Sequence, residues 1–265
     1  MSRPGPGPRD SADWLVAHRG IPHSFPENSV TGVRAALEAG ARFVEFDVQM
    51  TRDEVPVVLH DDNLARVSGS TDEGDDEVGA LDWSALADRS IGEPGRFGPK
   101  FAHERIPSLA DMLALIDRYR GVTAFVEIKR QSLERFGTAP VVESVHAELR
   151  RAATRCVPIS FDAAALEAIR ARGAGTIGLG IKPWNVETRS AAERLAPDYL
   201  FIRHDRIPDG DDPFWPGDWQ WVVYTVDDPG LADTLIARGA DLIETNRFPG
   251  MLEDLRGASG PGGCK

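Results

Sequence analysis

The chain has 265 residues, of which 42% are hydrophobic, and a formal net charge of −12. This composition fits one large soluble domain, and the negative charge argues against nucleic acid or an anionic membrane surface as the main partner. Two cysteines are too few for a disulfide framework, and no apolar run is long enough to span a membrane, so we expect a cytoplasmic protein without stable membrane association.

The first part of the chain predicts a strand, a helix, a longer extended segment and an irregular insertion. A strand is expected over residues 14–19, followed by a helix that Asn28 or Ser29 caps and that ends at Gly40. Residues 43–61 contain two strand-like runs. Residues 62–106 are acidic and rich in glycine, with one helical turn expected over 83–86, so they predict an inserted loop or small lobe.

After this insertion, strand and helix patterns alternate. Eight strands are expected in all, and each but one is followed by a helical pattern; they begin at Leu15, Phe43, Thr123, Val157, Thr176, Tyr199, Gln220 and Leu242. The exception is the segment 205–218, which is dominated by Pro and Asp. This pattern predicts an α/β protein with a TIM (β/α)8 barrel over residues 13–256, and an open doubly wound sheet is the competing fold. Residues 1–12 and 257–265 are expected to be disordered tails.

Polar residues collect at the predicted carboxyl ends of the first strands, where TIM barrels carry their active sites. Glu45 and Asp47 are two residues apart in one strand, and so are Glu127 and Lys129 in another, so each pair faces one side. Three carboxylates favour a hard divalent cation, Mg²⁺ or Ca²⁺. The other members of the group are two histidines suited to proton transfer and basic groups suited to a phosphate, namely His18, His60, Arg19 and Lys129.

Each of these residues also has a purely structural interpretation. Glu127 and Lys129 can pair with each other inside the barrel, and His60 can bind Asp61. Asn28 is as suited to capping a helix as to contacting a substrate. The convergence of all of them on one side of the first three barrel strands favours metal-assisted displacement at phosphorus.

The ordered set of short motifs resembles glycerophosphodiester phosphodiesterases. It comprises His18-Arg19-Gly20, Pro26-Glu27-Asn28, Glu45-Phe46-Asp47-Val48, Thr51-x-Asp53, Pro56-Val57-Val58, His60-Asp61, Ile106-Pro107-Ser108-Leu109, Glu127-Ile128-Lys129 and Ser160-Phe161-Asp162. The resemblance implies a TIM barrel with a small insertion after the second strand. It further implies a divalent metal on Glu45, Asp47 and Glu127, an acid–base pair in His18 and His60, and a phosphate on Arg19.

Two runs depart from the family pattern. Tyr224-Thr225-Val226-Asp227 stands where Trp-Thr-Val-Asn is usual, and Thr245-Asn246-Arg247-Phe248-Pro249 stands where Thr-Asp-x-Pro is usual. Both are expected to lie away from the metal and histidine residues.

The predicted reaction is metal-dependent hydrolysis of a glycerophosphodiester to sn-glycerol 3-phosphate and an alcohol, with a small molecule as the partner. Three alternatives stay open: a phospholipase D-like relative acting on lysophospholipids or sphingolipids, a non-catalytic module that binds a phosphorylated ligand, and an unrelated barrel enzyme such as a metal-dependent aldolase. The alcohol, the choice between Mg²⁺ and Ca²⁺, the roles of the two histidines and the oligomeric state are not specified by the sequence.

Overall fold

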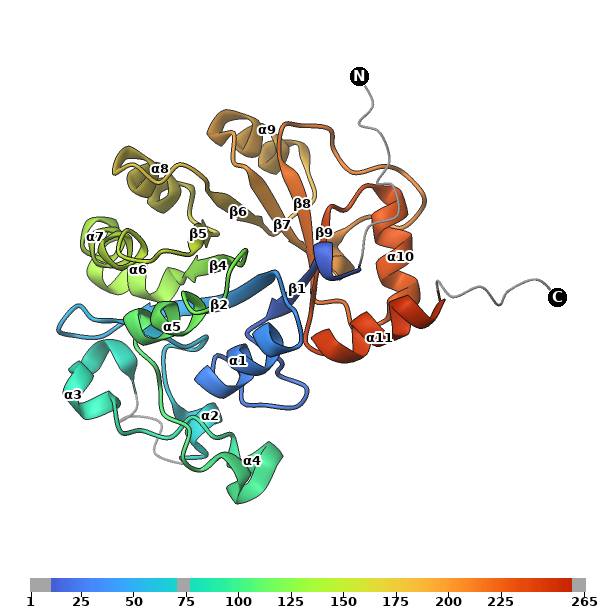
Figure 1. The fold of residues 1–265 in the computed structure, drawn as a ribbon. Coiled ribbons are helices and arrows are strands. Elements are labelled where there is room, and N and C mark those ends of the chain that lie inside the picture. The colour runs from blue at the N-terminus through green and yellow to red at the C-terminus, as the bar shows by residue number, and fades with distance from the viewer. Residues whose placement is uncertain (1–10, 71–76, 259–265) are drawn as a thin grey trace.

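The computed structural model describes residues 11–70 and 77–258, and eight of its strands form a closed parallel barrel (Figure 1). The barrel order is β1-β2-β4-β5-β6-β7-β8-β9, and the pairing of β1 with both β2 and β9 closes it. The barrel strands are β1 (Leu15–His18), β2 (Phe43–Met50), β4 (Thr123–Ile128), β5 (Arg155–Ser160), β6 (Gly178–Ile181), β7 (Tyr199–Arg203), β8 (Gln220–Tyr224) and β9 (Leu242–Thr245). The prediction of a TIM barrel is confirmed, and the open sheet is excluded.

Helices surround the barrel and begin at the caps that the sequence predicts. The Ser29 hydroxyl accepts a hydrogen bond from the Gly32 N–H, and Ser108 does the same for Asp111. The covering helices are α1 (Val30–Glu38), α5 (Leu109–Ile116), α6 (Arg130–Phe136), α7 (Thr138–Leu149), α8 (Ala163–Ala171), α9 (Val186–Leu195), α10 (Pro229–Arg238) and α11 (Phe248–Ala258). Helix α6 was not predicted.

The connection between β7 and β8 contains aromatic residues where the other strands are followed by a helix. All of its residues are described, and its one helical turn is η4 (His204–Arg206). Trp184 and Trp215 lie with ring centroids 4.1 Å apart, and the Trp221 indole N–H donates to the Trp215 carbonyl at 3.1 Å. Phe214 also packs on Trp221, which belongs to β8. Aromatic rings therefore bury β8 in place of a helix.

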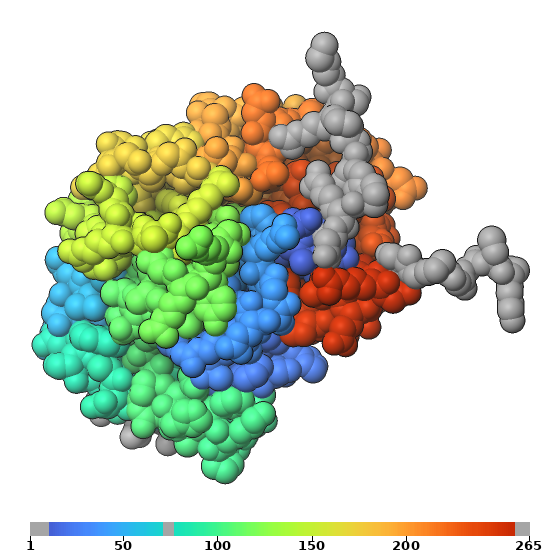
Figure 2. Space-filling view, in the orientation of Figure 1, coloured from blue at the N-terminus to red at the C-terminus, as the bar shows by residue number. Residues whose placement is uncertain are grey.

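The insertion after β2 forms a small lobe with its own hydrophobic cluster. Strand β3 (Pro56–Val58) pairs antiparallel with β2, and the lobe continues through α2 (Ala65–Ser68), η2 (Val78–Ala80), α3 (Trp83–Leu86), α4 (Pro94–Phe97) and η3 (Gly98–Phe101). The helical turn expected over residues 83–86 is confirmed. The cluster is made of Val57, Leu59, Leu64, Val67, Val78, Leu86, Ile91 and Ile106. Figure 2 shows the lobe in cyan and green at the lower left of the molecule.

Residues 1–10 and 259–265, which hold most of the expected tails, lie outside the described part of the chain. The described residues 11–12 belong to η1 (Ser11–Asp13), and residues 257–258 belong to α11. Within the described residues, regular structure therefore extends two residues beyond the predicted limits at each end. Among the described residues, no helix has the length and apolar character needed to cross a membrane.

Candidate active site

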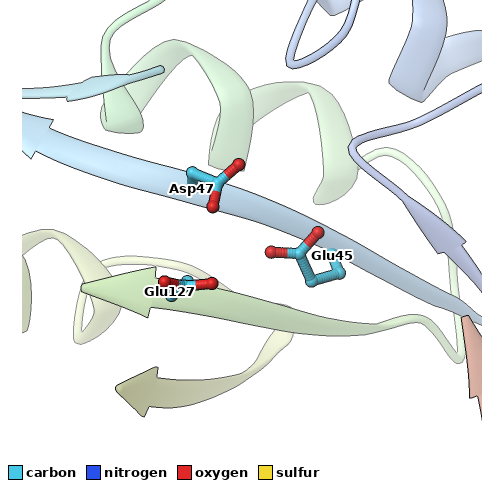
Figure 3. Close-up of side chains that lie close together, drawn as sticks. All are labelled: Glu45, Asp47 and Glu127. Atoms are coloured by element: carbon cyan, nitrogen blue, oxygen red, sulfur yellow. The ribbon is translucent and has the colours of Figure 1, made fainter. Parts of the chain in front are cut away.

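Three carboxylates from adjacent strands meet at the carboxyl end of the barrel (Figure 3). Residue Asp47 of β2 lies opposite Glu127 of β4 in the sheet register, and Glu45 projects from β2 on the same side as Asp47. One carboxylate oxygen from each residue lies within 4.8 Å of the others. Glu45 and Asp47 are buried, and Glu127 is partly buried. The predicted convergence of these three residues is therefore present.

The electrostatic states of the three carboxyl groups differ. Burial and the neighbouring Asp47 charge raise the pKa of Glu45 well above its usual value. Burial also raises the pKa of Glu127, against the opposing effect of Lys129. Burial alone would raise the pKa of Asp47, but the charges of Arg19 and Lys129 lower it far below its usual range. The site thus holds more carboxyl groups than its own basic side chains can neutralise.

Lys129 and Arg19 both contact these acids. The Lys129 ammonium lies 2.8 Å from Glu127 Oε1 and 3.2 Å from Asp47 Oδ1. The Arg19 guanidinium Nε lies 3.0 Å from Asp47 Oδ2. The structural pairing of Glu127 with Lys129 therefore exists, and it lies within the same site as the other predicted residues.

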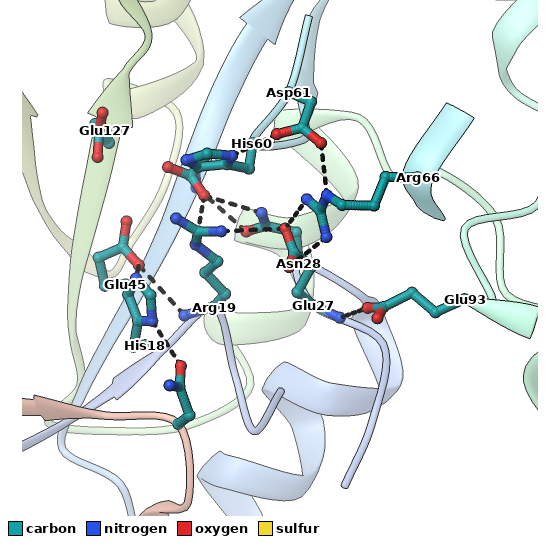
Figure 4. Close-up of polar contacts among 12 residues, drawn as sticks. His18, Arg19, Glu27, Asn28, Glu45, His60, Asp61, Arg66, Glu93 and Glu127 are labelled. Carbon is teal, nitrogen blue, oxygen red and sulfur yellow. Dashed lines mark hydrogen bonds and ion pairs between the residues drawn. The ribbon is translucent and has the colours of Figure 1, made fainter. Parts of the chain in front are cut away.

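His18 projects from the end of β1 with its two ring nitrogens in different surroundings (Figure 4). Its Nδ1 lies 2.9 Å from Asn246 Oδ1, so Nδ1 carries the proton and donates to this amide oxygen. Its Nε2 lies 3.8 Å from Glu45 Oε2. Burial, helped by the Arg19 charge, lowers the pKa of His18 to about 4, which makes the ring neutral near pH 7.

The contact with Asn246 corrects one expectation from the sequence. The two runs that depart from the family pattern, residues 224–227 and 245–249, were both expected to lie away from the metal and histidine residues. Asn246 instead binds His18, and Tyr224 lines the same cavity as His18 and His60. Strand β9 pairs with β1, so closure of the barrel brings residues 228 positions apart into contact.

His60 is held by a chain of ion pairs that begins in the inserted lobe (Figure 4). Its Nδ1 lies 2.6 Å from Asp61 Oδ1, and Asp61 Oδ2 accepts from Arg66 Nε at 2.7 Å. Arg66 in turn donates to both oxygens of Glu27, which also accepts from Arg19 at 3.1 Å. The His60–Asp61 pairing is therefore present and fixes the ring within the site.

Asn28 and Glu27 support the site from the loop after β1. The side-chain Nδ2 of Asn28 donates to Asp47 Oδ2 at 3.0 Å, and its side-chain Oδ1 accepts from the backbone N–H of Asp47 at 3.2 Å. Ser29, not Asn28, caps α1. Asn28 has φ 57°, a left-handed conformation that Asn tolerates better than most residues. The Glu27 N–H donates to Glu93 of the lobe at 2.7 Å, which ties this loop to the insertion.

A cavity of about 700 Å³ opens at this end of the barrel, a size suited to a small-molecule ligand. Six of the seven predicted site residues line it: His18, Arg19, Glu45, His60, Glu127 and Lys129. The seventh, Asp47, is fully buried and contacts Arg19 and Lys129. Sequence reasoning missed the four charged lining residues that come from β6 to β9 or the segments that follow these strands, namely Lys182, Arg203, Arg206 and Glu244. No spacing pattern marks Glu244, because its strand has no second acid two residues away.

The three carboxylates fit a divalent cation. A cation bound by oxygen at about 2.4 Å has ligand oxygens at most about 4.8 Å apart, which agrees with the observed spread of these carboxylate oxygens. Glu45, Asp47 and Glu127 outnumber the two cations that contact them, Arg19 and Lys129. A bound cation would offset this excess, and an all-oxygen set favours Mg²⁺ or Ca²⁺ over Zn²⁺.

Known structures show the same fold. A phosphodiesterase from Oleispira antarctica, solved in complex with the product sn-glycerol-3-phosphate, has a TM-score of 0.77 and 21% sequence identity, covering 92% of this chain and 96% of that one. Among curated proteins, a glycerophosphodiester phosphodiesterase from Caldanaerobacter subterraneus subsp. tengcongensis is 38% identical over 102 residues, covering 38% of this chain and 40% of the relative.

The mouse protein glycerophosphodiester phosphodiesterase 1 is 33% identical over 122 residues, covering 46% of this chain and 35% of the relative. The chain thus spans less than half the length of these curated relatives. The family model for the glycerophosphoryl diester phosphodiesterase family matches residues 18–249, which is most of the chain and includes every residue of the site. The chain belongs to the glycerophosphoryl diester phosphodiesterase family.

Proposed function

We propose that this protein hydrolyses glycerophosphodiesters to sn-glycerol 3-phosphate and an alcohol, with a divalent metal ion. One observation carries the proposal: in a member of this family, a cluster of three carboxylates borders a single cavity that two of them line together with two basic side chains and two histidines. The related fold from Oleispira antarctica with sn-glycerol-3-phosphate adds support for the product.

Glu45, Asp47 and Glu127 would hold the metal, which supplies Lewis-acid polarisation of the phosphoryl group and offsets developing negative charge. These oxygen ligands suit either Mg²⁺ or Ca²⁺. Arg19 and Lys129 add fixed positive charge for the phosphate. Both cations also offset the charge of Asp47, so they orient the carboxylates as well as contacting the substrate.

The surroundings of the two histidines favour different roles. The His18 ring is neutral near pH 7, and because its Nδ1 proton is committed to Asn246, its Nε2 is available to accept a proton from the attacking oxygen. That oxygen belongs either to water or to a neighbouring glycerol hydroxyl. His60 has a carboxylate partner at Nδ1 that offsets positive charge on the ring, which suits it to donate a proton to the departing alcohol.

The test measures release of sn-glycerol 3-phosphate from glycerophosphocholine and glycerophosphoglycerol by the purified protein and by the His18→Ala and His60→Ala variants. We expect each substitution to lower kcat by about 10²–10⁴-fold, because each removes one proton-transfer group. A His103→Ala variant serves as control, since His103 is exposed and lies outside the cavity. Near-normal turnover by both site variants would contradict the proposed acid–base pair.

The same assay separates the alternatives. Cleavage of a lysophospholipid without release of sn-glycerol 3-phosphate from either diester would favour the phospholipase D-like reaction. No turnover of any substrate, with metal still bound, would favour a binding module.

A further inference from the structure

The cavity has a second set of cations across its mouth from the carboxylates and histidines. In the closed barrel order, β6 stands opposite β1, and β7 stands opposite β2. Lys182 follows β6, and Arg203 and Arg206 lie at the end of β7 and in η4. All three line the cavity together with His18 and Glu45. A substrate whose phosphodiester lies at His18 can therefore extend toward these cations.

Two of these cations have no carboxylate within ion-pair distance among the described residues. Arg203 is bidentate to Asp205, with both contacts at 2.6 Å, and Arg130 on the same rim pairs with Glu134 at 2.7 Å. Lys182 and Arg206 form no such pair in the described ranges 11–70 and 77–258. The Arg206 guanidinium instead donates to the backbone carbonyl of Lys182 at 3.3 Å, which places it beside the main chain of that residue.

Lys182 rests on an aromatic residue of the cavity. Its ammonium lies 5.2 Å from the centroid of the Phe161 ring, within the range of a cation–π contact. The ring is packed tightly on Gly180 of β6, because a Cβ atom there would lie 2.6 Å from the ring. The absence of a side chain at Gly180 thus lets Phe161 lie flat under Lys182, and all three residues line the cavity.

Lys182 and Arg206 are both exposed to solvent at the edge of the cavity, in a chain whose net charge is −12. Both side chains line one cavity, so an anionic group bound there would be attracted by two positive charges. The phosphodiester itself belongs beside Arg19 and Lys129, on the opposite side of the cavity. Glycerol carries only hydroxyl groups, so an anionic group at Lys182 and Arg206 must belong to the alcohol.

We propose that the cavity selects glycerophosphodiesters whose alcohol carries a second anionic group, such as a phosphomonoester, and that Lys182 and Arg206 bind this group. The inference rests on the proposed function, since it names the substrate class of the same site. It makes Lys182 and Arg206 specificity residues that do not act on the reacting phosphorus.

The test compares kcat/KM for glycerophosphoinositol and glycerophosphoinositol 4-phosphate, which differ by one phosphomonoester. Free Mg²⁺ or Ca²⁺ and ionic strength are held equal, because the added phosphate binds metal. We expect the wild-type protein to prefer the phosphorylated substrate. Lys182→Gln and Arg206→Gln should each lower the ratio of the two kcat/KM values by about five- to ten-fold, as expected for a charged hydrogen bond near solvent.

Arg118→Gln is the matched control. It removes the same charge, but Arg118 is exposed and follows α5 on the opposite end of the barrel, so the ratio should stay at the wild-type value. Equal use of the two substrates, or an unchanged ratio in both site variants, would overturn the inference while leaving the proposed function intact. Release of sn-glycerol 3-phosphate from glycerophosphocholine or glycerophosphoglycerol but from neither inositol substrate would also overturn the inference alone, and release from none of the four would overturn both.

Discussion

Glu244 offers a sharp test of the electrostatics of the cavity, through the substitution Glu244→Gln. Its side chain is buried, with a relative exposure of 2%, and its Oε1 atom has no hydrogen-bond partner among the described residues. Burial raises the pKa of Glu244 from 4.5 to about 8, and the nearby Glu127 charge adds to the effect. The carboxyl group is therefore protonated in the metal-free folded protein at neutral pH.

The sign of the pH dependence follows from this shift. Between pH 4.5 and about 8 the unfolded chain has released the Glu244 proton and the folded protein retains it, so unfolding becomes easier as the pH rises. Each pH unit costs about 1.4 kcal/mol, and the full interval corresponds to about 5 kcal/mol. Glutamine carries no titratable proton, so the variant lacks this loss of stability.

The assay is urea unfolding with chelator present, from pH 6 to pH 9, for the wild-type protein and Glu244→Gln. The difference in unfolding free energy between the variant and the wild type should increase by about 2–3 kcal/mol over this range in favour of the variant. Glu253→Gln, on the exposed side of α11, is the control and should follow the wild type. A Glu244→Gln profile parallel to that of the wild type would refute the reasoning.

Two further predictions concern residues that support the site. Asp61→Asn should lower kcat by about 10²-fold or more with little change in KM, because an amide offers one acceptor oxygen where His60 and Arg66 use both oxygens of the carboxylate. Steady-state kinetics measure this, and an unchanged kcat would contradict it. Ser29→Ala should lower the free energy of unfolding by about 1 kcal/mol, because the Gly32 N–H loses its cap; urea unfolding measures this, and equal stability would show that the cap contributes nothing.

The carboxylate cluster of the site can be predicted from the sequence because strand periodicity is a local property. Glu45 and Asp47 share a face whatever the fold, and so do Glu127 and Lys129. Their meeting follows once β2 and β4 are neighbours in a parallel barrel. Helix α6 was missed because residues 130–136 are mostly charged or polar, with only Leu133 and Phe136 as apolar positions.

The remaining site residues depend on tertiary structure that no local pattern encodes. Asn246 reaches His18 only because β9 pairs with β1. Glu244 is a single acid in an apolar strand without an acidic neighbour two residues away, so the pattern that identified Glu45 and Asp47 does not apply. Lys182 follows β6 and Arg206 lies in η4 after β7, so they meet only because β6 and β7 are neighbours in the barrel.

The most direct test of metal-dependent phosphodiester hydrolysis is a metal titration of sn-glycerol 3-phosphate release by the wild-type protein and Glu45→Gln, starting from chelator-treated enzyme. Glu134→Gln is the matched control, because Glu134 lines the same cavity but pairs with Arg130 outside the carboxylate cluster. We predict that Mg²⁺ or Ca²⁺ restores activity to the wild type and the control, while Glu45→Gln stays inactive or needs far more metal. Full activity of the wild type in chelator, or of Glu45→Gln at the same metal concentration, would contradict the account.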